Sequence, residues 1–111
     1  MHTPSLGFII RRENPPEHIR SYARQVEATG YDEIWIVEDC FFASGIASAA
    51  TVLAATTTIR VGLGIVPAVA RNAAFLAMEI ATLTRLHPGR FLPGVGHGVT
   101  EWMRQIGALP A

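Results

Sequence analysis

Segments with the apolar, β-branched composition of strands alternate with segments of helical periodicity along this chain. The strand patterns cover residues 6–10, 34–37, 59–66 and 91–95, and a helical pattern follows each of them. Strands that alternate with helices form a parallel sheet, because each helix carries the chain back to the start of the next strand in a right-handed crossover. The sequence therefore predicts an α/β fold with the order β-α-β-α-β-α-β-α.

Residues typical of helix ends flank the helical patterns. The side-chain oxygens of Asn14, Ser44, Asn72 and Thr100 are predicted to accept hydrogen bonds from the first N–H groups of the four helices. Gly30 is expected to end the first helix. The third helix, residues 73–86, has an apolar side that is expected to be buried. This side consists of Ala73, Leu76, Ala77, Ile80, Leu83 and Leu86.

Composition indicates a buried core and excludes several kinds of partner. Half of the residues are hydrophobic and 16% are charged, which argues against disorder. Nine basic and nine acidic residues give a net charge of zero, so the chain lacks the charge signature of nucleic-acid or anionic-membrane binding. The apolar runs are too short to span a bilayer, and the N-terminus lacks the order of a secretory signal. A single cysteine, Cys40, fits a reducing compartment. We expect a cytoplasmic protein.

The chain is short for its own pattern. Four βα units fit either half of a (β/α)8 barrel or a doubly wound open sheet, and a complete barrel needs about 200 residues or more. With 111 residues, the chain is expected to be a truncated gene product, a partial sequence or an excised half. Its outer strands would then have unpaired edges, which favour dimerisation. We therefore expect the isolated chain not to be a stable monomer.

Glycines follow the apolar cores of the third and fourth strands, at the carboxyl ends where α/β proteins bind ligands. Gly64, Ile65 and residues 96–98 are expected to share this end of the sheet. His97 lies between two glycines, which would let the backbone approach a ligand closely. A turn histidine bonded to a neighbouring carbonyl is the alternative. Glu38 is expected either to face the interior of the barrel or to cap a backbone amide.

The sequence contains no metal-ligand spacing, no Ser-His-Asp arrangement and no phosphate loop of the G-x-x-x-x-G-K type. The chemistry is therefore expected to belong to a bound cofactor, which the protein orients. No residue is assigned as the catalytic base.

Several segments, in their order and spacing, resemble one known family. They are GYDEIW at 30–35, RVGLGIVP at 60–67, EIATL at 79–83, PGRF at 88–91 and GVGHG at 94–98. Together they resemble the N-terminal part of the luciferase-like monooxygenase superfamily, in particular the deazaflavin-dependent branch that includes methylenetetrahydromethanopterin reductases. The resemblance implies the first four βα units of a TIM (β/α)8 barrel. Residues 1–111 would be its N-terminal half, with no separate second domain.

The same resemblance implies hydride transfer between coenzyme F-420, a deazaflavin, and a small organic substrate. It also implies a non-prolyl cis peptide between Gly64 and Ile65, forming a bulge that backs the cofactor ring. Asp39 stands where relatives often have an acidic residue near the cofactor, and Cys40 stands where they commonly have histidine. An inert buried thiol is the alternative for Cys40. The cofactor-binding residues are then expected to be Asp39, Cys40, Gly64, Ile65, Gly96, His97 and Gly98.

Two other functions stay open. One is an FMN-dependent monooxygenase that uses oxygen. The other is a non-catalytic half-barrel that pairs with a partner chain, since strands five to eight of a barrel are missing.

Overall fold

The computed structural model describes residues 3–109, and four strands form one parallel sheet in the order β1-β2-β3-β4. The strands are β1 (Gly7–Ile10), β2 (Glu33–Ile36), β3 (Arg60–Pro67) and β4 (Phe91–Gly96). The helices are α1 (Ile19–Thr29), α2 (Gly45–Ala55), α3 (Ala73–Leu86) and α4 (Thr100–Gln105), and the short 3-10 turns are η1 (Pro16–His18) and η2 (Ala68–Ala70). The predicted alternation of strands and helices is confirmed.

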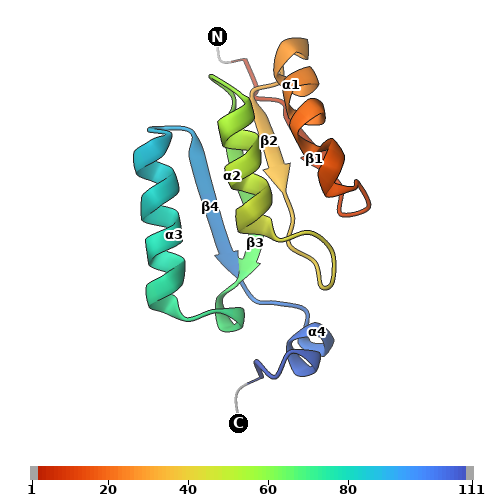
Figure 1. Ribbon diagram of the computed structural model, residues 1–111, viewed down its shortest axis with the longest axis vertical. Coiled ribbons are helices and arrows are strands. Elements are labelled where there is room, and N and C mark those ends of the chain that lie inside the picture. Colours follow the sequence, from red (N-terminus) through yellow and green to blue (C-terminus); the bar gives the residue numbers. More distant parts are fainter. Residues whose placement is uncertain (1–2, 110–111) are drawn as a thin grey trace.

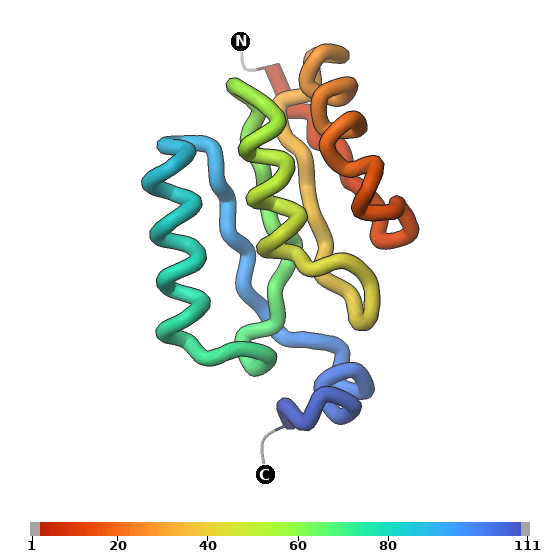
Figure 2. The backbone as a smooth tube through the Cα atoms, viewed as in Figure 1, coloured from red at the N-terminus to blue at the C-terminus, as the bar shows by residue number. Residues whose placement is uncertain are grey.

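Three helices cover one face of the sheet, and α4 lies beyond the carboxyl ends of the strands (Figure 1). The tube in Figure 2 shows that α1, α2 and α3 each return the chain across this same face. We call the opposite face the inner face. It is uncovered over the described residues, where Ile9 of β1 is 58% exposed and Trp35 of β2 is partly exposed. None of the helices within residues 3–109 has the length and apolar character needed to cross a membrane.

The core lies between the sheet and the three covering helices. Alternate strand residues point toward the helices, which is why these positions are apolar in every strand. The strands bury Ile10, Ile34, Ile36, Val61, Leu63, Val66 and Phe91, and the helices bury Ile19, Ala23, Val26, Ala49, Val52, Leu53, Leu76 and Leu83. Burying one large aliphatic side chain contributes roughly 1.5–3 kcal/mol, so this layer is the main source of stability.

Helix α3 is less buried than its periodicity predicts. Leu76 and Leu83 are buried and Ile80 packs partly against the core. Ala73, Ala77 and Leu86 are exposed, so for them the prediction was wrong. The reason is position: α3 lies over the edge strand β4, and no helix of residues 3–109 covers its outer side.

Two of the four predicted helix caps are confirmed. The Ser44 hydroxyl accepts a hydrogen bond from the N–H of Ala47 at 3.3 Å, and the Asn72 side chain accepts one from Ala74 at 2.8 Å. The other two predictions, at Asn14 and Thr100, were wrong. The chain enters α1 through the turn η1 after Pro15, whose extended backbone (φ −62°, ψ 141°) displaces the cap by one residue.

Thr100 is the first residue of α4, and Val99 holds the cap position without a side-chain hydrogen bond. Gly30 ends α1 as predicted. Its φ of 99° lies in the left-handed region that favours glycine, and its N–H bonds to the carbonyl of Glu27 at 3.1 Å.

Two opposite charges hold the loop between α2 and β3 at the amino end of the sheet. The Glu27 carboxylate accepts from the backbone N–H groups of residues 57–59 at 2.8–3.2 Å. The Arg90 guanidinium donates to the carbonyl of Ile59 at 2.9 Å and to that of Thr56 at 3.3 Å. Glu27 therefore accepts hydrogen bonds from the N–H groups of the loop, and Arg90 donates hydrogen bonds to its carbonyl groups. Together these bonds hold the start of β3 in place.

Glu27→Gln is expected to lower the free energy of unfolding by about 1–2 kcal/mol, because a neutral amide accepts these N–H groups less strongly than a carboxylate. Chemical denaturation at neutral pH measures the change. Glu17→Gln is the matched control, since Glu17 is exposed in η1. Equal stabilities of the two variants would contradict this role of Glu27.

The same contact predicts a pH dependence. Partial burial of Glu27 acts to raise its pKa, but the backbone donors of residues 57–59 outweigh it and lower the pKa below 4.5. Stability from this carboxylate is therefore complete above pH 4.5 and is lost as the pH falls through the lowered folded-state pKa. The stability difference between wild type and Glu27→Gln should narrow below that pH in denaturation series at stepped pH. A stability difference that stays constant with pH would contradict this role of the Glu27 carboxylate.

Candidate functional site

The predicted site residues all lie at or beyond the carboxyl end of the sheet. Asp39 and Cys40 follow β2, Gly64 and Ile65 lie in the second half of β3, and residues 96–98 end β4 and lead toward α4. The strands point to this end together, and α4 lies beside it (Figure 1). The parallel sheet is the reason that segments so far apart in sequence meet here.

Strand β3 carries a bulge within this region. Leu63 pairs with Pro93, but the next pairing joins Val66 to Val95, so β3 has one residue more than β4 between these points. The peptide bond between Gly64 and Ile65 is cis, as the resemblance implied. A second non-prolyl cis bond, between Cys40 and Phe41, was not predicted.

Glycines of β4 let this strand pass close to the bulge. A Cβ atom at Gly96 would lie 3.3 Å from the Cδ1 of Ile65, and one at Gly94 would overlap the carbonyl oxygen of Leu63. Larger residues here would push β4 away from β3. The structure thus brings Ile65 and Gly96 into direct contact.

The backbone of the bulge is exposed at Gly64. Gly64 is exposed although Leu63 before it and Val66 shortly after it are fully buried. The backbone is therefore exposed to solvent at Gly64, although most other residues of β3 are buried. An exposed backbone without a side chain allows a flat group to approach closely.

The structure assigns Gly98 a packing role. A Cβ atom at Gly98 would lie 2.6 Å from the Sδ of Met103, which is buried in α4, so glycine allows α4 to close on the chain. His97 is exposed, and its side chain makes no hydrogen bond within residues 3–109, so the alternative of a carbonyl-bonded turn histidine is wrong.

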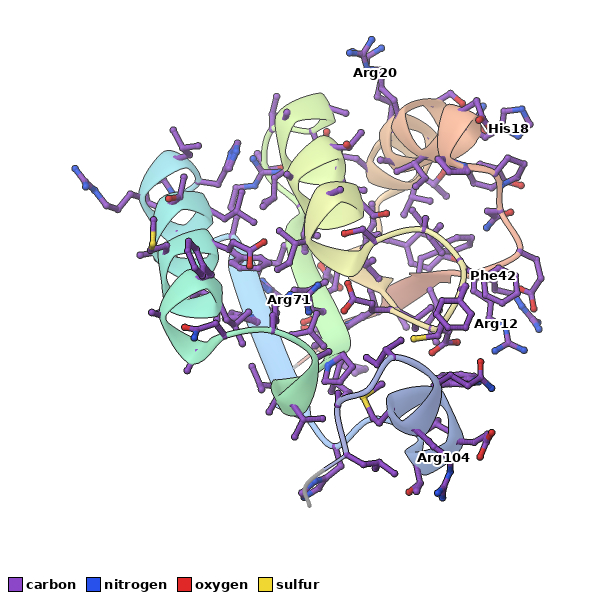
Figure 3. All side chains as sticks on the ribbon, turned by 60° about the horizontal axis from the view of Figure 1, so that its bottom comes forward. Arg12, His18, Arg20, Phe42, Arg71 and Arg104 are labelled. Carbon is purple, nitrogen blue, oxygen red and sulfur yellow. The ribbon has the colours of Figure 1, made fainter. Side chains whose placement is uncertain are left out.

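An ion pair joins the ends of β1 and β2. Asp39 Oδ2 lies 3.4 Å from the Nη1 of Arg12, and the guanidinium of Arg12 lies 4.9 Å from the centre of the Phe42 ring (Figure 3). Cation–π contact at an exposed site contributes about 0.5–1 kcal/mol and limits the freedom of Arg12. A hollow of about 260 Å³ adjoins the pair. It is lined by Ile9, Arg11, Arg12, Glu13, Val37 and Asp39.

A second ion pair, between Glu38 and Arg71, was missed by the sequence analysis. Arg71 donates to both carboxylate oxygens of Glu38, at 2.8 and 3.0 Å, and Glu38 also accepts from the N–H of Gly45 at 2.7 Å. Amide capping is therefore the correct alternative for Glu38. Hydrogen bonds from its guanidinium to Glu38, together with the charge of that carboxylate, raise the pKa of Arg71. The separation of Glu38 and Arg71 by 33 residues left no local signal.

Trp35 lies on the inner face beneath the bulge. A Cβ atom at Gly62 would overlap its indole, and Cβ atoms at Gly7 and Gly64 would lie 3.0 and 3.4 Å from the ring. The indole N–H donates to Glu33 at 3.1 Å. Glycines of β1 and β3 thus leave space for one aromatic side chain of β2. The indole of Trp35 packs directly against Gly64.

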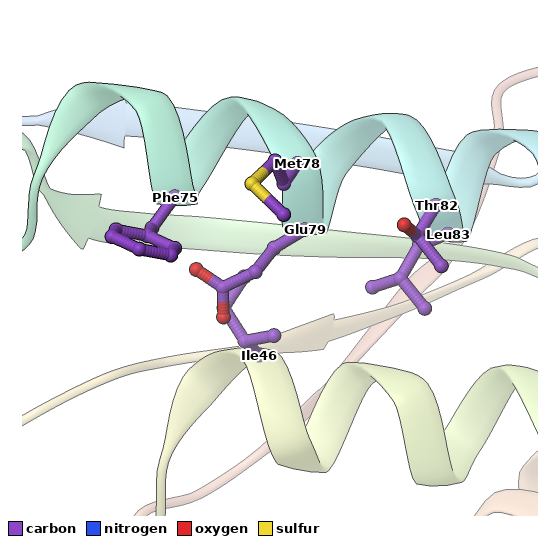
Figure 4. Close-up of a pocket in the computed structure, with 6 residues that line it drawn as sticks. All are labelled: Ile46, Phe75, Met78, Glu79, Thr82 and Leu83. Carbon is purple, nitrogen blue, oxygen red and sulfur yellow. The ribbon is translucent and has the colours of Figure 1, made fainter.

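A larger hollow, of about 540 Å³, lies between α2 and α3 on the helix-covered face (Figure 4). It is lined by Ile46, Phe75, Met78, Glu79, Thr82 and Leu83. None of the predicted site residues is among them, and the groove offers one carboxylate among mostly apolar groups. The carboxyl end of the sheet, with its charged and glycine positions, is the better candidate site.

Comparison with known proteins identifies the family of the chain. Residues 2–108 match the family described as luciferase-like monooxygenase. A 5,10-methylenetetrahydromethanopterin reductase of Methanolobus tindarius is 36% identical over 95 residues, which are 85% of this chain and 29% of that protein. A luciferase-like monooxygenase of Escherichia coli K12 is 35% identical over 98 residues, which are 83% of this chain and 29% of that protein.

Solved structures give the same fold. The coenzyme F-420-dependent tetrahydromethanopterin reductase of Methanopyrus kandleri superposes with a TM-score of 0.82 at 26% identity, over 96% of this chain and 30% of that one. The oxygenating constituent of a Pseudomonas putida diketocamphane monooxygenase, solved with FMN, superposes at 0.83 with 19% identity, over 95% of this chain and 33% of that one, which shows the fold alone.

The chain thus spans about 29% of the length of the curated relatives it matches. The predicted fold class, α/β with part of a (β/α)8 barrel, is confirmed by the parallel β1-β2-β3-β4 order and by these superpositions. On the strength of the matched residues and of the two relatives above 30% identity, the chain belongs to the luciferase-like monooxygenase family.

Proposed function

We propose that this chain supplies the N-terminal half of the barrel, and part of the cofactor site, of an oxidoreductase that uses a flavin or deazaflavin. The observation that carries the proposal is the open bulge at Gly64 and Ile65, with Gly96 packed against it and Asp39 beyond the neighbouring strand. The relatives named as reductases and monooxygenases support it.

Within this class we propose coenzyme F-420 as the cofactor and an organic molecule as the substrate. When bound, the deazaflavin supplies hydride chemistry. Ile65 presents an apolar side chain at the bulge, and the glycine at 64 keeps the backbone free of a Cβ on the exposed side of β3. Asp39, restrained by Arg12, would place a negative charge at the rim of the site. We assign Cys40, His97 and Gly98 to the surroundings of the ring.

FMN with oxygen is the second candidate for the same site. The superposition on an FMN-containing monooxygenase favours it, while the two reductases with methanopterin substrates favour F-420. Both cofactors present a flat tricyclic ring, and the bulge suits either.

Titration of the protein with each cofactor tests the proposal, using the chain together with any continuation that its gene encodes. Fluorescence titration should show saturable binding of F-420 and weaker binding of FMN. Tight FMN binding, with rapid oxygen consumption after reduction, would favour the monooxygenase instead. Binding of neither cofactor would overturn the proposed function.

Gly96→Val should weaken the binding of that cofactor at least about tenfold, because the new side chain would displace Ile65 from the bulge. Ala81→Val, on the exposed outer side of α3, is the matched control and should leave the dissociation constant unchanged. Equal affinities of the two variants would contradict the placement of the ring at the bulge.

A different observation supports pairing with further strands. β1 and β4 each pair with one neighbour within the described residues, and the inner face exposes Ile9 and, in part, Trp35. Parallel edges with an apolar face favour additional strands, from a complementary half-barrel or from a second copy.

The chain of residues 1–111 alone is therefore expected to associate. Light scattering should give a mass above the 12.0 kDa of one chain, and the loss of helical signal on heating should be broad. A monomeric mass together with a sharp cooperative melt would contradict this expectation.

A further inference from the structure

The Glu38–Arg71 pair lies immediately behind the proposed site and has no role in it so far. Glu38 directly precedes Asp39 in the chain, and Arg71 lies between η2 and α3, after the strand that carries the bulge. The side chains are 14% and 23% exposed, so the pair is largely removed from water. An ion pair in such a position holds its geometry far better than one on the surface.

Glu38 packs against the start of α2, close to the side chain of Leu63 in β3. A Cβ atom at Gly45 would lie 3.0 Å from the Cβ of Glu38 and 3.4 Å from the Cδ2 of Leu63. The carboxylate also accepts the N–H of Gly45 at the start of α2. Glycine at 45 therefore lets the start of α2 approach Glu38 closely.

Arg71 connects three segments. Its two Nη atoms bind both oxygens of Glu38, and its Nε lies 3.8 Å from Glu79 of α3. The planar guanidinium allows this two-point contact, whereas the ammonium group of lysine does not. The side chain of Arg71, labelled in Figure 3, thus joins the turn after β2, the connection after β3 and the helix α3.

The two consecutive carboxylates, Glu38 and Asp39, therefore form ion pairs with two different arginines. Glu38 binds Arg71, on the α2 and α3 side, and Asp39 lies 3.4 Å from Arg12 at the end of β1. Because Glu38, Asp39 and Cys40 are consecutive in the chain, the contact of Glu38 with Arg71 limits the positions that Asp39 and Cys40 can take.

We propose that Glu38 and Arg71 are positioning residues, whose two-point contact holds the segment of residues 39–42 in register with the bulge of β3. The proposal rests on the proposed function, because the ligand that residues 39–42 would contact is the flavin or deazaflavin ring proposed above. Neither residue touches the ring; each acts through Asp39 and Cys40.

Three variants test the proposal. Glu38→Gln keeps an acceptor for Gly45 but removes the charge that Arg71 binds, and Arg71→Lys keeps a positive charge but removes the two-point contact. Glu17→Gln is the control: it also replaces a carboxylate by an amide, but Glu17 is exposed in η1. Denaturation of all three establishes that each variant is folded.

The first measurement uses Cys40, the single cysteine of the chain, as a reporter. The rate of its reaction with a chromogenic disulfide reagent should rise roughly fivefold or more in Glu38→Gln and Arg71→Lys, because the segment around it opens more often. In Glu17→Gln the rate should stay at the wild-type value. Equal rates in all three variants would overturn the proposal, and Arg71→Lys decides alone if Glu38→Gln does not fold.

The second measurement is the dissociation constant of the cofactor that the wild type binds, F-420 or FMN. It should rise about tenfold in Glu38→Gln and Arg71→Lys, as expected for a misplaced contact with the ring, and stay unchanged in Glu17→Gln. An unchanged constant in the first two variants would overturn the proposal. If the wild type binds neither cofactor, the proposed function fails, and the Cys40 rates alone decide whether the pair positions residues 39–42.

Discussion

The start of β3 is the point on which the sheet depends, and it is fixed by two charges. Glu27 binds the N–H groups of the loop before β3, and Arg90 binds its carbonyls. From there Arg60 pairs with Glu33 and Val61 with Phe91, so both registers of the central strand are set at this end. The extra residue of β3 is then accommodated only further along, as the bulge at Gly64 and Ile65.

The two ends of the sheet consequently differ in character. At the amino end, charged side chains satisfy the backbone of a loop, and their partners are all within the fold. At the carboxyl end, glycines at 64, 94 and 96 bring backbone to the surface or to close contact. Asp39 and Arg12 there are half-exposed and share a hollow. The contacts that stabilise the sheet and the proposed ligand site thus lie at opposite ends, as is general for α/β barrels.

The order of strands and helices was predictable because each element has its own period, and the caps at Ser44 and Asn72 were predictable because capping is local. The cap at Asn14 was not, since the Pro15-Pro16 pair moves the turn. Periodicity identified the apolar side of α3 but not how much of it a neighbour covers. The contact of Glu38 with Arg71 joins residues 33 apart, so only the folded sheet reveals it. The cis bond came from family resemblance, and no local pattern indicates it.

The indole of Trp35 lies across positions that are glycine on both neighbouring strands. A side chain at 62 is excluded while tryptophan stands at 35, and side chains at 7 and 64 would press on the same ring. In related sequences these positions should therefore change together: a smaller residue at 35 admits larger ones at 7, 62 and 64. The total side-chain volume at positions 7, 35, 62 and 64 of the inner face is therefore limited, and relatives can distribute this volume differently among β1, β2 and β3.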